Sequence, residues 1–591
     1  MKPELIALRR EMQAHGIDYY MIRSEDFHGS EYVGDHFKCR AFVSGFTGSA
    51  GTLLVGPDMA GLWTDGRYFL QAEQQLAGNG IDLFRMRDPG VPTLEDYLKS
   101  NMKPGQCLGY DGRTVSAGLH RKFLAELVPS GITLCTSLDL AGMIWTNRPA
   151  LSAHPAWELP LSCAGRSRAQ KLADVRNAMQ EKQADALILT SLDDIAWLLN
   201  MRGDDVACNP VALSWLAITA SSATLFINPS ILSEALAQTL IADNIALAPY
   251  EGIYDYIRSL GAGKLWLNLN RANSAILEAV PASVTLFDAP VPTELAKAIK
   301  NDTELAGIRA AHIKDGAAVT RFMAFLKSRV GTESMTELSL ADTLEEFRGQ
   351  QPGYLGPSFA PIVGYGPHGA IVHYSADEQS CAEVKAASLL LIDSGGQYTE
   401  GTTDITRTFA LGEISAEQKH HFTLVLRSHL QLASLLFRAG CTGAVLDGVA
   451  RAPMWRELLD YNHGTGHGIG HVLNVHEGPQ SIGWHYKNDT VFEPGMVVSN
   501  EPGLYLTGKY GIRHENLMAC TLAADNEFGR FLGFETLTFV PFDLDAVEPA
   551  LLTQAERAQL NAYHAQVREK LLPLMVTEAE RGFLIHATRS V

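Results

Sequence analysis

Two segments in the first half of the chain share a pattern in which an amphipathic helix is followed by an apolar strand. The helical pattern LRREMQAHGID begins at Leu8, and its counterpart VRNAMQEKQAD begins at Val175. The apolar runs YYMI and ALIL follow these helices, and hairpin patterns come at similar distances beyond them, in AGTLLVGPDMAGLWTDGRYF and LSWLAITASSATLFI. Chance similarity between short helices is the alternative, but two related α/β domains are the simplest explanation of the repeat.

The second half contains helical patterns that carry their own start signals. A proline-containing link, APVPTELAKAIKND, leads to Asn301, which forms a capping pair with the glutamate three residues later and precedes a long helical periodicity. Ser415 and Gln418 repeat this pairing before a helix that we expect to end at Gly440, because glycine is a common helix stop. A further helix is expected over residues 444–459.

Hairpin patterns dominate the strands of the second half, so we expect an α+β fold there with a mostly antiparallel sheet. The last segment, from about residue 543, is largely helical in pattern. At 591 residues the chain is too long for one core. We therefore expect four parts, at residues 1–150, 151–292, 293–542 and 543–591.

The composition is that of an ordinary soluble globular protein, with 46% hydrophobic and 19% charged residues. Lysine and arginine number 48 against 66 aspartates and glutamates, which gives a net charge of −18. This negative balance disfavours nucleic acid or an anionic membrane as the main partner.

Cysteine usage and the N-terminus suggest a cytoplasmic protein. The eight cysteines lie far apart without a C-x-x-C pair, and we interpret them as reduced core thiols. The first twenty residues carry charges where a secretory signal needs an apolar region. An uncharged run over residues 206–233 contains prolines, asparagines and many hydroxyl residues, so we interpret it as a buried hairpin and expect no membrane span.

The stretch LLLIDSGGQYTEGTTDITRTF, which begins at Leu389, holds two aspartates in a hairpin-like pattern. Asp393 closes an apolar strand, and Asp404 stands where the returning strand begins. Two carboxylates brought together repel each other unless a cation binds between them. The alternative is that both are solvated turn residues, a common place for aspartate.

The stretch NHGTGHGIGHVLNVHEGP places four histidines, at positions 463, 467, 471 and 476, among four glycines. This glycine content makes a helix unfavourable, so we expect a loop or strand. Glycine allows close approach of the backbone, and histidine offers a neutral nitrogen ligand or a proton donor. A single histidine is more often structural, but a cluster set in glycine favours a site.

Two further carboxylates stand in strand patterns. Glu501 ends the apolar strand of MVVSNEPGLYL just before a Pro-Gly turn. Glu515 is expected inside the alternating strand of YGIRHENLMAC, on the same face as Arg513. A carboxylate among apolar neighbours is unfavourable unless it is paired, and pairing of Glu515 with Arg513 alone is the alternative to a metal site.

Four carboxylates and one histidine at strand ends or within strands predict a dinuclear metal site, because their charge of −4 would be balanced by two divalent cations. Oxygen-rich ligation with one imidazole suits Mn²⁺, although Co²⁺, Fe²⁺ or Zn²⁺ also fits by ligand type. Two such ions about 3.5 to 4 Å apart hold a bridging water as hydroxide and polarise a carbonyl for attack. This pattern predicts a hydrolase, with amide and phosphate substrates both open.

The motifs DSGGQYTEGTTDITRT, HGTGHGIG, NEPG and GIRHEN, in this order and spacing, resemble those of the aminopeptidase P (X-prolyl aminopeptidase) branch of the metallopeptidases with the pita-bread fold. The resemblance covers nearly the whole chain and implies the long, three-domain form. It implies two creatinase-like α/β N-terminal domains (1–150 and 151–292), a pita-bread α+β catalytic domain (293–542) and a small C-terminal helical segment (543–591).

The resemblance also implies a ligand set. By position, Asp404, His467 and Glu501 mainly serve one Mn²⁺ and Asp393 serves the other, while Asp404 and Glu515 bridge the pair. Glu501 is also implied as the base for the attacking water.

Four further residues receive roles by the same resemblance. His373 and His476 match histidines that hold the substrate and stabilise the developing oxyanion or move protons. His463 matches a histidine that lines the substrate pocket, and Arg513 would fix a ligand carboxylate. His514 departs from the family, where an aliphatic residue is frequent; strand alternation makes it face away from Glu515, so we expect altered packing and no new ligand.

The implied reaction is release of the N-terminal residue from peptides whose second residue is proline, by a cytoplasmic homodimer. The nearest rival is a prolidase, which cleaves Xaa-Pro dipeptides but in its usual form lacks the middle domain. A non-catalytic binding module on the same fold is a rival from another class, and a creatinase-like amidinohydrolase is the third. None of the five ligand positions is lost here, which disfavours the binding module.

Overall fold

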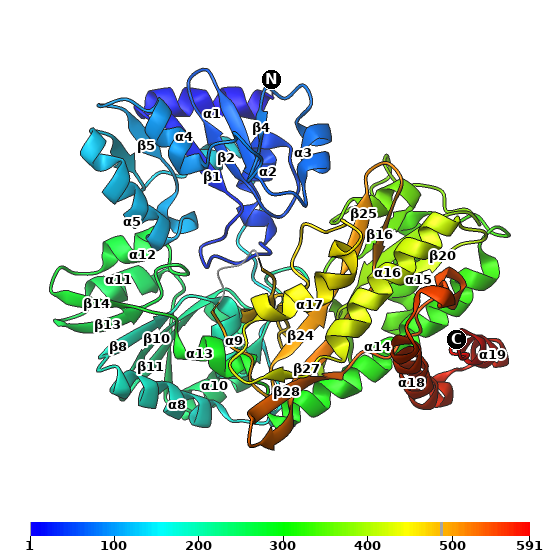
Figure 1. The fold of residues 1–591 in the computed structure, drawn as a ribbon. Helices are drawn as coiled ribbons and strands as arrows, with labels where there is room; N and C mark the ends of the chain where they lie inside the picture. Colours follow the sequence, from blue (N-terminus) through cyan, green and yellow to red (C-terminus); the bar gives the residue numbers. More distant parts are fainter. Residues whose placement is uncertain (1, 485–488) are drawn as a thin grey trace. The chain divides into compact units, whose positions relative to one another are not determined.

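The structure, a computed structural model, describes residues 2–484 and 489–591 (Figure 1). The chain forms two compact units. Unit 1 comprises Met1–Leu159 and Arg166–Thr293, and unit 2 comprises Pro160–Gly165 and Glu294–Val591. Apart from residues 160–165, both of the expected α/β domains lie within unit 1, while the exact limits of the four expected parts stay a prediction.

Unit 1 contains two six-stranded sheets with the same topology. The first has the order β4-β3-β2-β1-β5-β6 and the second the order β12-β11-β10-β8-β13-β14. The strands of the first are β1 (Tyr19–Arg23), β2 (Thr52–Val55), β3 (Ala60–Thr64), β4 (Asp82–Arg85), β5 (Cys107–Gly109) and β6 (Thr133–Cys135). Those of the second are β8 (Ala186–Leu189), β10 (Ser214–Thr219), β11 (Ala223–Ile227), β12 (Ile245–Ala248), β13 (Gly263–Leu267) and β14 (Val284–Asp288), and a short ribbon joins β7 (Trp157–Glu158) to β9 (Met201–Arg202).

Corresponding strands of the two sheets also pair in the same direction. β1 and β8 each lie antiparallel to the first strand of a hairpin, β2 and β10, and parallel to a later strand, β5 and β13. The repeat in the sequence is therefore a structural repeat, and the uncharged run is the buried hairpin β10–β11.

The helices that precede the first strand of each sheet are those of the sequence repeat. α1 (Pro3–Ala14) precedes β1, and α8 (Arg168–Glu181) precedes β8. The apolar side chains of α1 that face the first sheet belong to its core cluster. The other helices of this unit are α2 (Cys39–Ser44), α3 (Phe69–Leu76), α4 (Leu94–Asn101), α5 (Ala117–Glu126), α6 (Leu140–Ile144), α9 (Leu192–Leu199), α10 (Glu234–Ala242), α11 (Gly252–Arg258) and α12 (Ser274–Ala279).

Unit 2 is an α+β fold in which every described strand pairing within a sheet is antiparallel, as expected. Its sheets have the orders β15-β18-β19, β16-β17-β20, β21-β28-β27-β24-β22-β23 and β25-β26. The strands are β15 (Tyr354–Pro357), β16 (Ile362–Tyr365), β17 (Leu389–Ser394), β18 (Gly396–Tyr398), β19 (Gly401–Thr402), β20 (Ile405–Ala410), β21 (Phe437–Arg438), β22 (Gly466–Gly468), β23 (Glu477–Ile482), β24 (Val497–Asn500), β25 (Gly503–Leu506), β26 (Tyr510–Arg513), β27 (Asn516–Asn526) and β28 (Gly529–Thr536).

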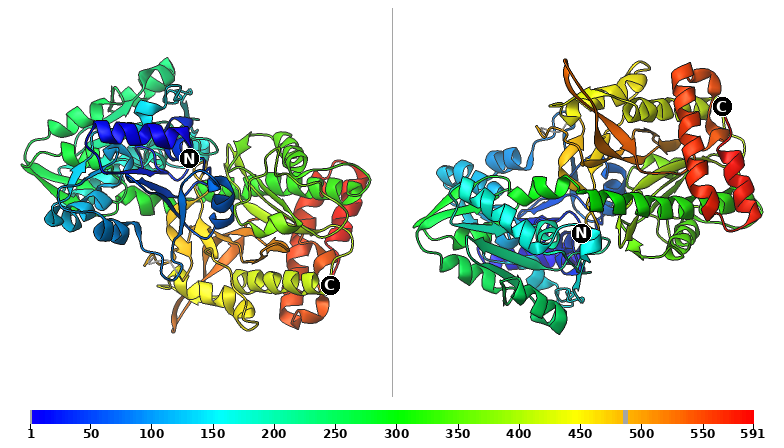
Figure 2. Two further views of the ribbon diagram at one scale, coloured as in Figure 1. Left: turned by 90° about the horizontal axis from the view of Figure 1, so that it is seen from above. Right: turned by 90° about the horizontal axis from the view of Figure 1, so that it is seen from below.

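The helices of unit 2 are α7 (Leu161–Ala164), α13 (Pro292–Ala298), which begins at the last two residues of unit 1, α14 (Asp302–Arg329), α15 (Glu337–Gly349), α16 (Ala416–Ala433), α17 (Gly443–Trp455), α18 (Gln554–Leu571) and α19 (Glu578–Ala587). Asn301 and Ser415 each form the expected capping box. The C-terminal helices α18 and α19 pack beside α14, as Figure 2 shows.

Two helix ends differ from the sequence prediction. α16 ends at Ala433 and does not reach Gly440, because residues 437–438 form a strand that pairs with β28. Gly440 has a φ of +96° and lies beyond this strand. α17 covers 443–455, four residues fewer at its end than expected.

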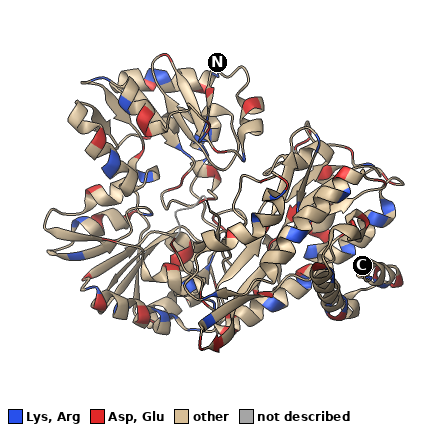
Figure 3. Ribbon diagram, viewed as in Figure 1, with Lys and Arg blue, Asp and Glu red and all other residues tan. Residues whose placement is uncertain are grey.

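The burial of the cysteines and the distribution of charged residues bear on the sequence predictions. All eight cysteines are free, but only Cys39 and Cys520 are buried, so the prediction of core thiols is wrong for the other six, whose positions are partly exposed. Basic and acidic residues are interspersed along the helices of each unit (Figure 3). Within residues 2–484 and 489–591, no helix has the length and apolar character needed to cross a membrane.

Candidate metal centre

The hairpin-like pattern around the two aspartates is an antiparallel pair of strands, β17 and β20. Asp393 lies near the end of β17, opposite Thr406 of β20, and Asp404 immediately precedes β20. Both aspartates are buried, with exposed fractions of 9% and 4%. The interpretation as solvated turn residues is therefore wrong, and two buried carboxylates stand at adjacent strand ends.

The glycine-rich histidine stretch forms strand β22, which lies beside β24. The amide of His467 donates to Ser499 Oγ at 2.9 Å, and the amide of Glu501 donates to the carbonyl of Thr465 at 2.8 Å. A Cβ at Gly466 would lie 2.0 Å from the carbonyl oxygen of Ser499, so only glycine allows this approach. The close pairing brings His467 next to Glu501, as the sequence pattern indicates.

Glu515 is not inside a strand, which corrects the sequence prediction. It lies between β26, which pairs with β25, and β27, which pairs with β24 and β28. The chain changes from one sheet to another at this point, and no glycine or proline in the sequence marks the change. The Glu515 amide donates to the carbonyl of Thr406 at 3.1 Å, so the residue lies over β20.

The carboxylates and His467 converge in the folded unit. His467 Nε2 lies 3.4 Å from Asp404 Oδ2 and 3.5 Å from Glu501 Oε1. One ligand atom each of Asp404, His467 and Glu515 falls within 4.8 Å of the others. This spacing is compatible with ligation of a shared cation.

The buried carboxylates have oxygens that the protein leaves unsatisfied. Within the described part of the chain, Asp393 Oδ1, Asp404 Oδ1 and Glu515 Oε1 are buried and accept no hydrogen bond. A buried hydrogen-bond acceptor without a partner is strongly unfavourable. The penalty is larger for these three oxygens because they belong to carboxylates, which can carry a charge. Bound divalent cations would satisfy all three, so the residues present fit a metal centre.

Burial and neighbouring charges shift the pKa values of these groups. Burial raises the pKa of Glu515 well above its usual value, and the charges of Asp404, Glu501 and Asp393 add to the shift. Burial also raises the pKa values of Glu501 and Asp393, against the lowering effects of His467 and of Arg513 respectively. Burial lowers the pKa of His467, but its hydrogen bond to Asp404 and the charge of Glu501 raise it to about 9.

Arg513 contacts a carboxylate of the cluster, but that carboxylate is Asp393. Arg513 Nη2 donates to Asp393 Oδ2 at 2.5 Å, Nη1 donates to Tyr505 Oη at 2.6 Å, and Nε donates to Thr406 Oγ1 at 3.1 Å. Glu515 instead accepts from Thr406 Oγ1 at 2.7 Å. The alternative of a simple Arg513–Glu515 pair is therefore wrong.

Two of the remaining histidines lie beside this cluster. His463 Nε2 lies 2.8 Å from Tyr505 Oη, and its Nδ1 lies 4.0 Å from Glu501 Oε2. The ring of His476 contacts the ring of His467 edge-on, with 4.2 Å between centroids. His373 is half-buried in the turn after the short helix η5 (Gly366–Ala370), and its role stays a prediction.

His471 and His514 lie outside the cluster. His471 is buried, and its Nε2 donates to the carbonyl of Glu400. His514 is completely buried, and its ring packs edge-on against Phe422 at 4.2 Å and against Phe542 at 5.5 Å. His514 therefore takes part in aromatic packing, and its direction relative to Glu515 stays a prediction.

The sequence reasoning missed Thr406, Ser499 and Tyr505, which contact the ligand residues. Ser499 Oγ donates to Glu501 Oε1 at 3.1 Å. Thr406 follows Asp404 by two residues, and Ser499 precedes Glu501 by two. Residues two apart in extended backbone share a face, so this spacing was a signal that could have identified both supporting residues.

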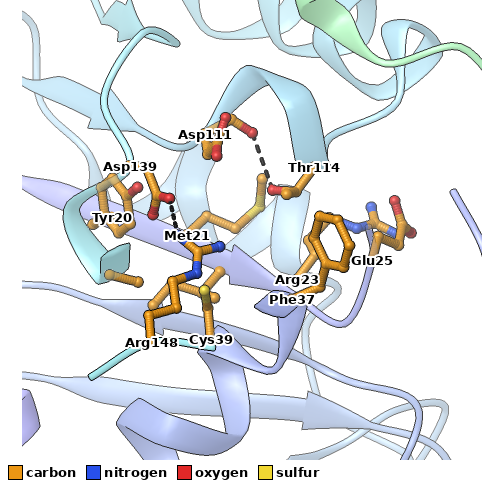
Figure 4. A pocket seen from close by; sticks show the side chains of 12 residues that line it. Tyr20, Met21, Arg23, Glu25, Phe37, Cys39, Asp111, Thr114, Asp139 and Arg148 are labelled. Atoms are coloured by element: carbon orange, nitrogen blue, oxygen red, sulfur yellow. Dashed lines mark hydrogen bonds and ion pairs between the residues drawn. The ribbon is translucent and has the colours of Figure 1, made fainter. Parts of the chain in front are cut away.

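Unit 1 has a separate polar pocket at the end of β1 (Figure 4), with a volume of about 330 Å³ that includes space open to solvent. Arg148 Nη1 donates to Asp139 Oδ2 at 2.5 Å across it, and Thr114 Oγ1 donates to the carbonyl of Asp111. Burial raises the pKa of the lining Cys39 thiol to about 12, which keeps it unreactive. Paired charges and an unreactive thiol give this pocket no evident chemistry.

Family models match the chain from end to end. The description "Creatinase/Prolidase N-terminal domain" matches twice, at residues 5–148 and 147–304. "Metallopeptidase family M24" matches residues 306–522, and "C-terminal region of peptidase_M24" matches residues 530–591.

Individual relatives agree with these models. A "Probable Xaa-Pro aminopeptidase P" of Laccaria bicolor is 39% identical over 97% of this chain and 90% of its own. The crystal structure of an X-prolyl aminopeptidase from Caenorhabditis elegans, described as a cytosolic enzyme with a di-nuclear active site, is 33% identical, has a TM-score of 0.94, and covers 100% of this chain and 99% of its own. An Xaa-Pro dipeptidase from Bacillus anthracis is 25% identical with a TM-score of 0.51, and its structure aligns 99% of its own chain with only 64% of this one. The chain therefore belongs to the M24 metallopeptidases, in the aminopeptidase P branch.

Proposed function

We propose that this protein is a metal-dependent aminopeptidase that releases the N-terminal residue from peptides with proline in the second position. The observation that carries the proposal is the convergence of Asp393, Asp404, His467, Glu501 and Glu515 in one unit. The unpartnered oxygens of this cluster supply the donors that a pair of cations needs.

We assign the ligands as the family pattern implies. Asp404, His467 and Glu501 would hold one ion and Asp393 the other, with Asp404 and Glu515 bridging them. The oxygen-rich set favours Mn²⁺, and Co²⁺, Fe²⁺ or Zn²⁺ would fit the same donors. When bound, such a pair lowers the pKa of water and polarises the scissile carbonyl.

The chain's own residues orient the reactants and move protons. Glu501 accepts the proton of the attacking water on its carboxylate, which Ser499 orients by a hydrogen bond to Oε1. His476, beside His467, and His373 hold the peptide and stabilise the developing oxyanion or transfer a proton to the leaving amine. His463 lines the pocket, where Tyr505 fixes its ring. Arg513 fixes Asp393.

Two rival functions give different predictions. A prolidase acts on Xaa-Pro dipeptides, but the Bacillus anthracis dipeptidase corresponds to only 64% of this chain. A non-catalytic pita-bread module needs no ligand set, whereas here five candidate ligands are retained and three of them have unsatisfied buried oxygens. The extra length and the retained ligands favour the aminopeptidase.

We also propose a homodimer in the cytoplasm. α17 and the segments that follow it expose large apolar side chains: Val445 (59% exposed), Trp455 (43%), Leu458 (94%) and Trp484 (50%). Exposed apolar residues gathered in one region are typical of an association surface. Light scattering would test the dimer, and a dimer that persists unchanged in Leu458→Glu and Val445→Glu would argue against this surface. Free cysteines and the cytosolic relative from Caenorhabditis elegans support the location.

The test of the activity is release of the first residue from an Xaa-Pro-Pro peptide and from an Xaa-Pro dipeptide by the same preparation. We expect turnover of the longer peptide, loss with a chelator, and recovery with Mn²⁺. Asp404→Ala and Glu501→Gln should lose nearly all activity, whereas Glu417→Gln, at a half-exposed glutamate on α16, should keep it. Preferred turnover of the dipeptide would support a prolidase, and full turnover by Glu501→Gln would contradict the assignment.

A further inference from the structure

Arg407 of β20 is a fully buried arginine beside the candidate metal centre. All of its guanidinium nitrogens donate to protein oxygens. Nη1 donates to the carbonyls of Glu515 at 2.6 Å and Thr406 at 2.9 Å, and Nε donates to the carbonyl of Pro541 at 3.2 Å. Nη2 donates to Asn516 Oδ1 at 2.7 Å, the carbonyl of Val540 at 2.9 Å and Tyr563 Oη at 3.0 Å.

The hydrogen bonds of Arg407 all go to neutral groups. Among the described residues, no carboxylate forms an ion pair with Arg407, although the Phe542 ring lies 4.1 Å below its guanidinium carbon. A buried charge without a counter-ion depends on complete hydrogen bonding. Nη2 shares its two hydrogens among three acceptors, so loss of one acceptor weakens this network and allows the guanidinium to move.

That guanidinium holds the backbone of Glu515. Glu515 lies where the chain changes sheets, just before β27, and its own amide donates to the carbonyl of Thr406 at 3.1 Å. Its carbonyl is bonded to Arg407, and the next residue, Asn516, is bonded through its side chain to the same guanidinium. Movement of Arg407 would therefore shift the Glu515 carboxylate relative to Asp404.

Tyr563 connects this arginine to the C-terminal segment. It lies on α18. Its hydroxyl oxygen accepts hydrogen bonds from Arg407 Nη2 and from the amide of Val540 at 3.1 Å. The same hydroxyl donates to the carbonyl of Val540 at 2.8 Å. The neighbouring residue His564 accepts the amide of Phe542 at Nε2. α18 therefore bonds both to Arg407 and to the loop that lies under it.

We propose that Tyr563 is a positioning residue for the metal centre. Through Arg407 it holds Glu515 in place, so the packing of the C-terminal helix α18 sets the affinity of the catalytic unit for its metal ions. The proposal rests on the assignment of Glu515 as a bridging ligand. It gives the C-terminal segment a role in the reaction, although this segment contributes no ligand.

The effect should appear first in metal binding. Loss of a group that orients a ligand typically reduces metal affinity or activity 10- to 100-fold, and because Tyr563 acts through Arg407 we expect the lower end, about tenfold. Tyr563→Phe removes one oxygen and keeps the ring packing. Val567→Ala on the same helix removes buried apolar volume but touches no polar group of this network.

The experiment titrates Mn²⁺ into chelator-treated full-length protein by calorimetry and records the thermal unfolding of each metal-free variant. Both variants should unfold at lower temperature than the wild type. Only Tyr563→Phe should bind Mn²⁺ about tenfold more weakly, with peptide release restored at higher Mn²⁺. Unchanged affinity in Tyr563→Phe, or an equal loss in Val567→Ala, would overturn the proposal.

Two further variants separate the possible failures. Glu515→Gln should lose tight binding of metal; if it binds both ions as the wild type does, the ligand assignment fails and the proposal with it. If Glu515→Gln loses metal while Tyr563→Phe does not, only the positioning role fails. Should Tyr563→Phe not fold, Phe542→Leu, which removes the ring under Arg407, takes its place with the same expected loss of affinity.

Discussion

Arg513 Nη2 lies 2.5 Å from Asp393 Oδ2, and both side chains are buried. The arginine comes from β26 and the aspartate from β17, so this pair connects two sheets of the catalytic unit. It occupies one oxygen of Asp393 and leaves Oδ1 unpartnered. Arg513 thus orients Asp393 for metal binding and does not neutralise the whole cluster.

Arg513→Lys should therefore weaken metal binding about 10- to 100-fold. A lysine keeps the charge but cannot donate at once to Asp393, Tyr505 and Thr406 as the planar guanidinium does. Calorimetric titration of the metal-free protein with Mn²⁺ checks this. Arg309→Lys, at an exposed ion pair with Glu535, is the control and should bind as the wild type does. Equal affinity in Arg513→Lys would show that charge alone suffices.

Thr406→Val should destabilise the catalytic unit, since it removes a hydroxyl and keeps the shape of the side chain. Thr406 Oγ1 donates to Glu515 Oε2 and accepts from Arg513 Nε. Each buried group left without its partner is unfavourable by about 1–3 kcal/mol. Urea unfolding checks this, and Thr406→Ser, which keeps the hydroxyl, should stay close to the wild type. If serine is as damaging as valine, packing of the methyl group and not the hydroxyl is responsible.

Much of the fold could be predicted from the sequence because its signals are local. The capping pairs at Asn301 and Ser415 mark helix starts that the structure has, and the repeat at Leu8 and Val175 marks two sheets of identical strand order. The strand ends at Asp393 and Glu501 could be located because each carboxylate comes soon after an apolar run and just before a glycine-containing turn.

The errors arise where tertiary pairing decides the local structure. The sequence from Ile512 to Cys520 contains no glycine or proline that would mark a break, yet the chain leaves one sheet and joins another at Glu515. Residues before Gly440 have helical patterns, but pairing with β28 makes them a strand. The partner of Arg513 is 120 residues away in sequence, and no spacing rule predicts such a contact.

Removal of metal should lower the unfolding temperature. Four carboxylates lie close together in this unit, and within the described residues three of them have a buried oxygen that accepts no hydrogen bond. A ligand that binds only the native state at 100 times its Kd stabilises it by about 2.7 kcal/mol, which corresponds to about 4 °C for a unit of this size. Differential scanning calorimetry with Mn²⁺ and with a chelator measures the shift. Asp404→Ala should show almost none, and an equal shift in that variant would indicate metal binding elsewhere.

Acid should destabilise the catalytic unit through His564 of α18. Burial lowers the pKa of His564 to about 3, and the charges of Arg407, Arg568 and Arg589 contribute. Its Nε2 accepts the Phe542 amide, so the folded protein holds it neutral. At pH values between the pKa of His564 in the folded protein and its pKa of about 6.5 in the unfolded chain, the unfolded chain binds more protons than the folded protein. The free energy of unfolding is therefore unaffected by this residue above the unfolded pKa. As pH falls below that value, His564 lowers the free energy of unfolding, by about 2 kcal/mol at pH 5.

The variant His564→Gln isolates this contribution, because glutamine supplies an acceptor for the Phe542 amide but does not titrate. The urea midpoint of the wild type should fall more between pH 7.5 and pH 5 than that of His564→Gln, and comparison of the two curves cancels the titration of all other groups, the metal-site carboxylates included. His586→Gln, at an exposed histidine of α19, is the matched control and should follow the wild type. Parallel curves for wild type and His564→Gln would mean that His564 is already charged in the folded protein, and the packing of α18 would then have to supply a counter-charge for it.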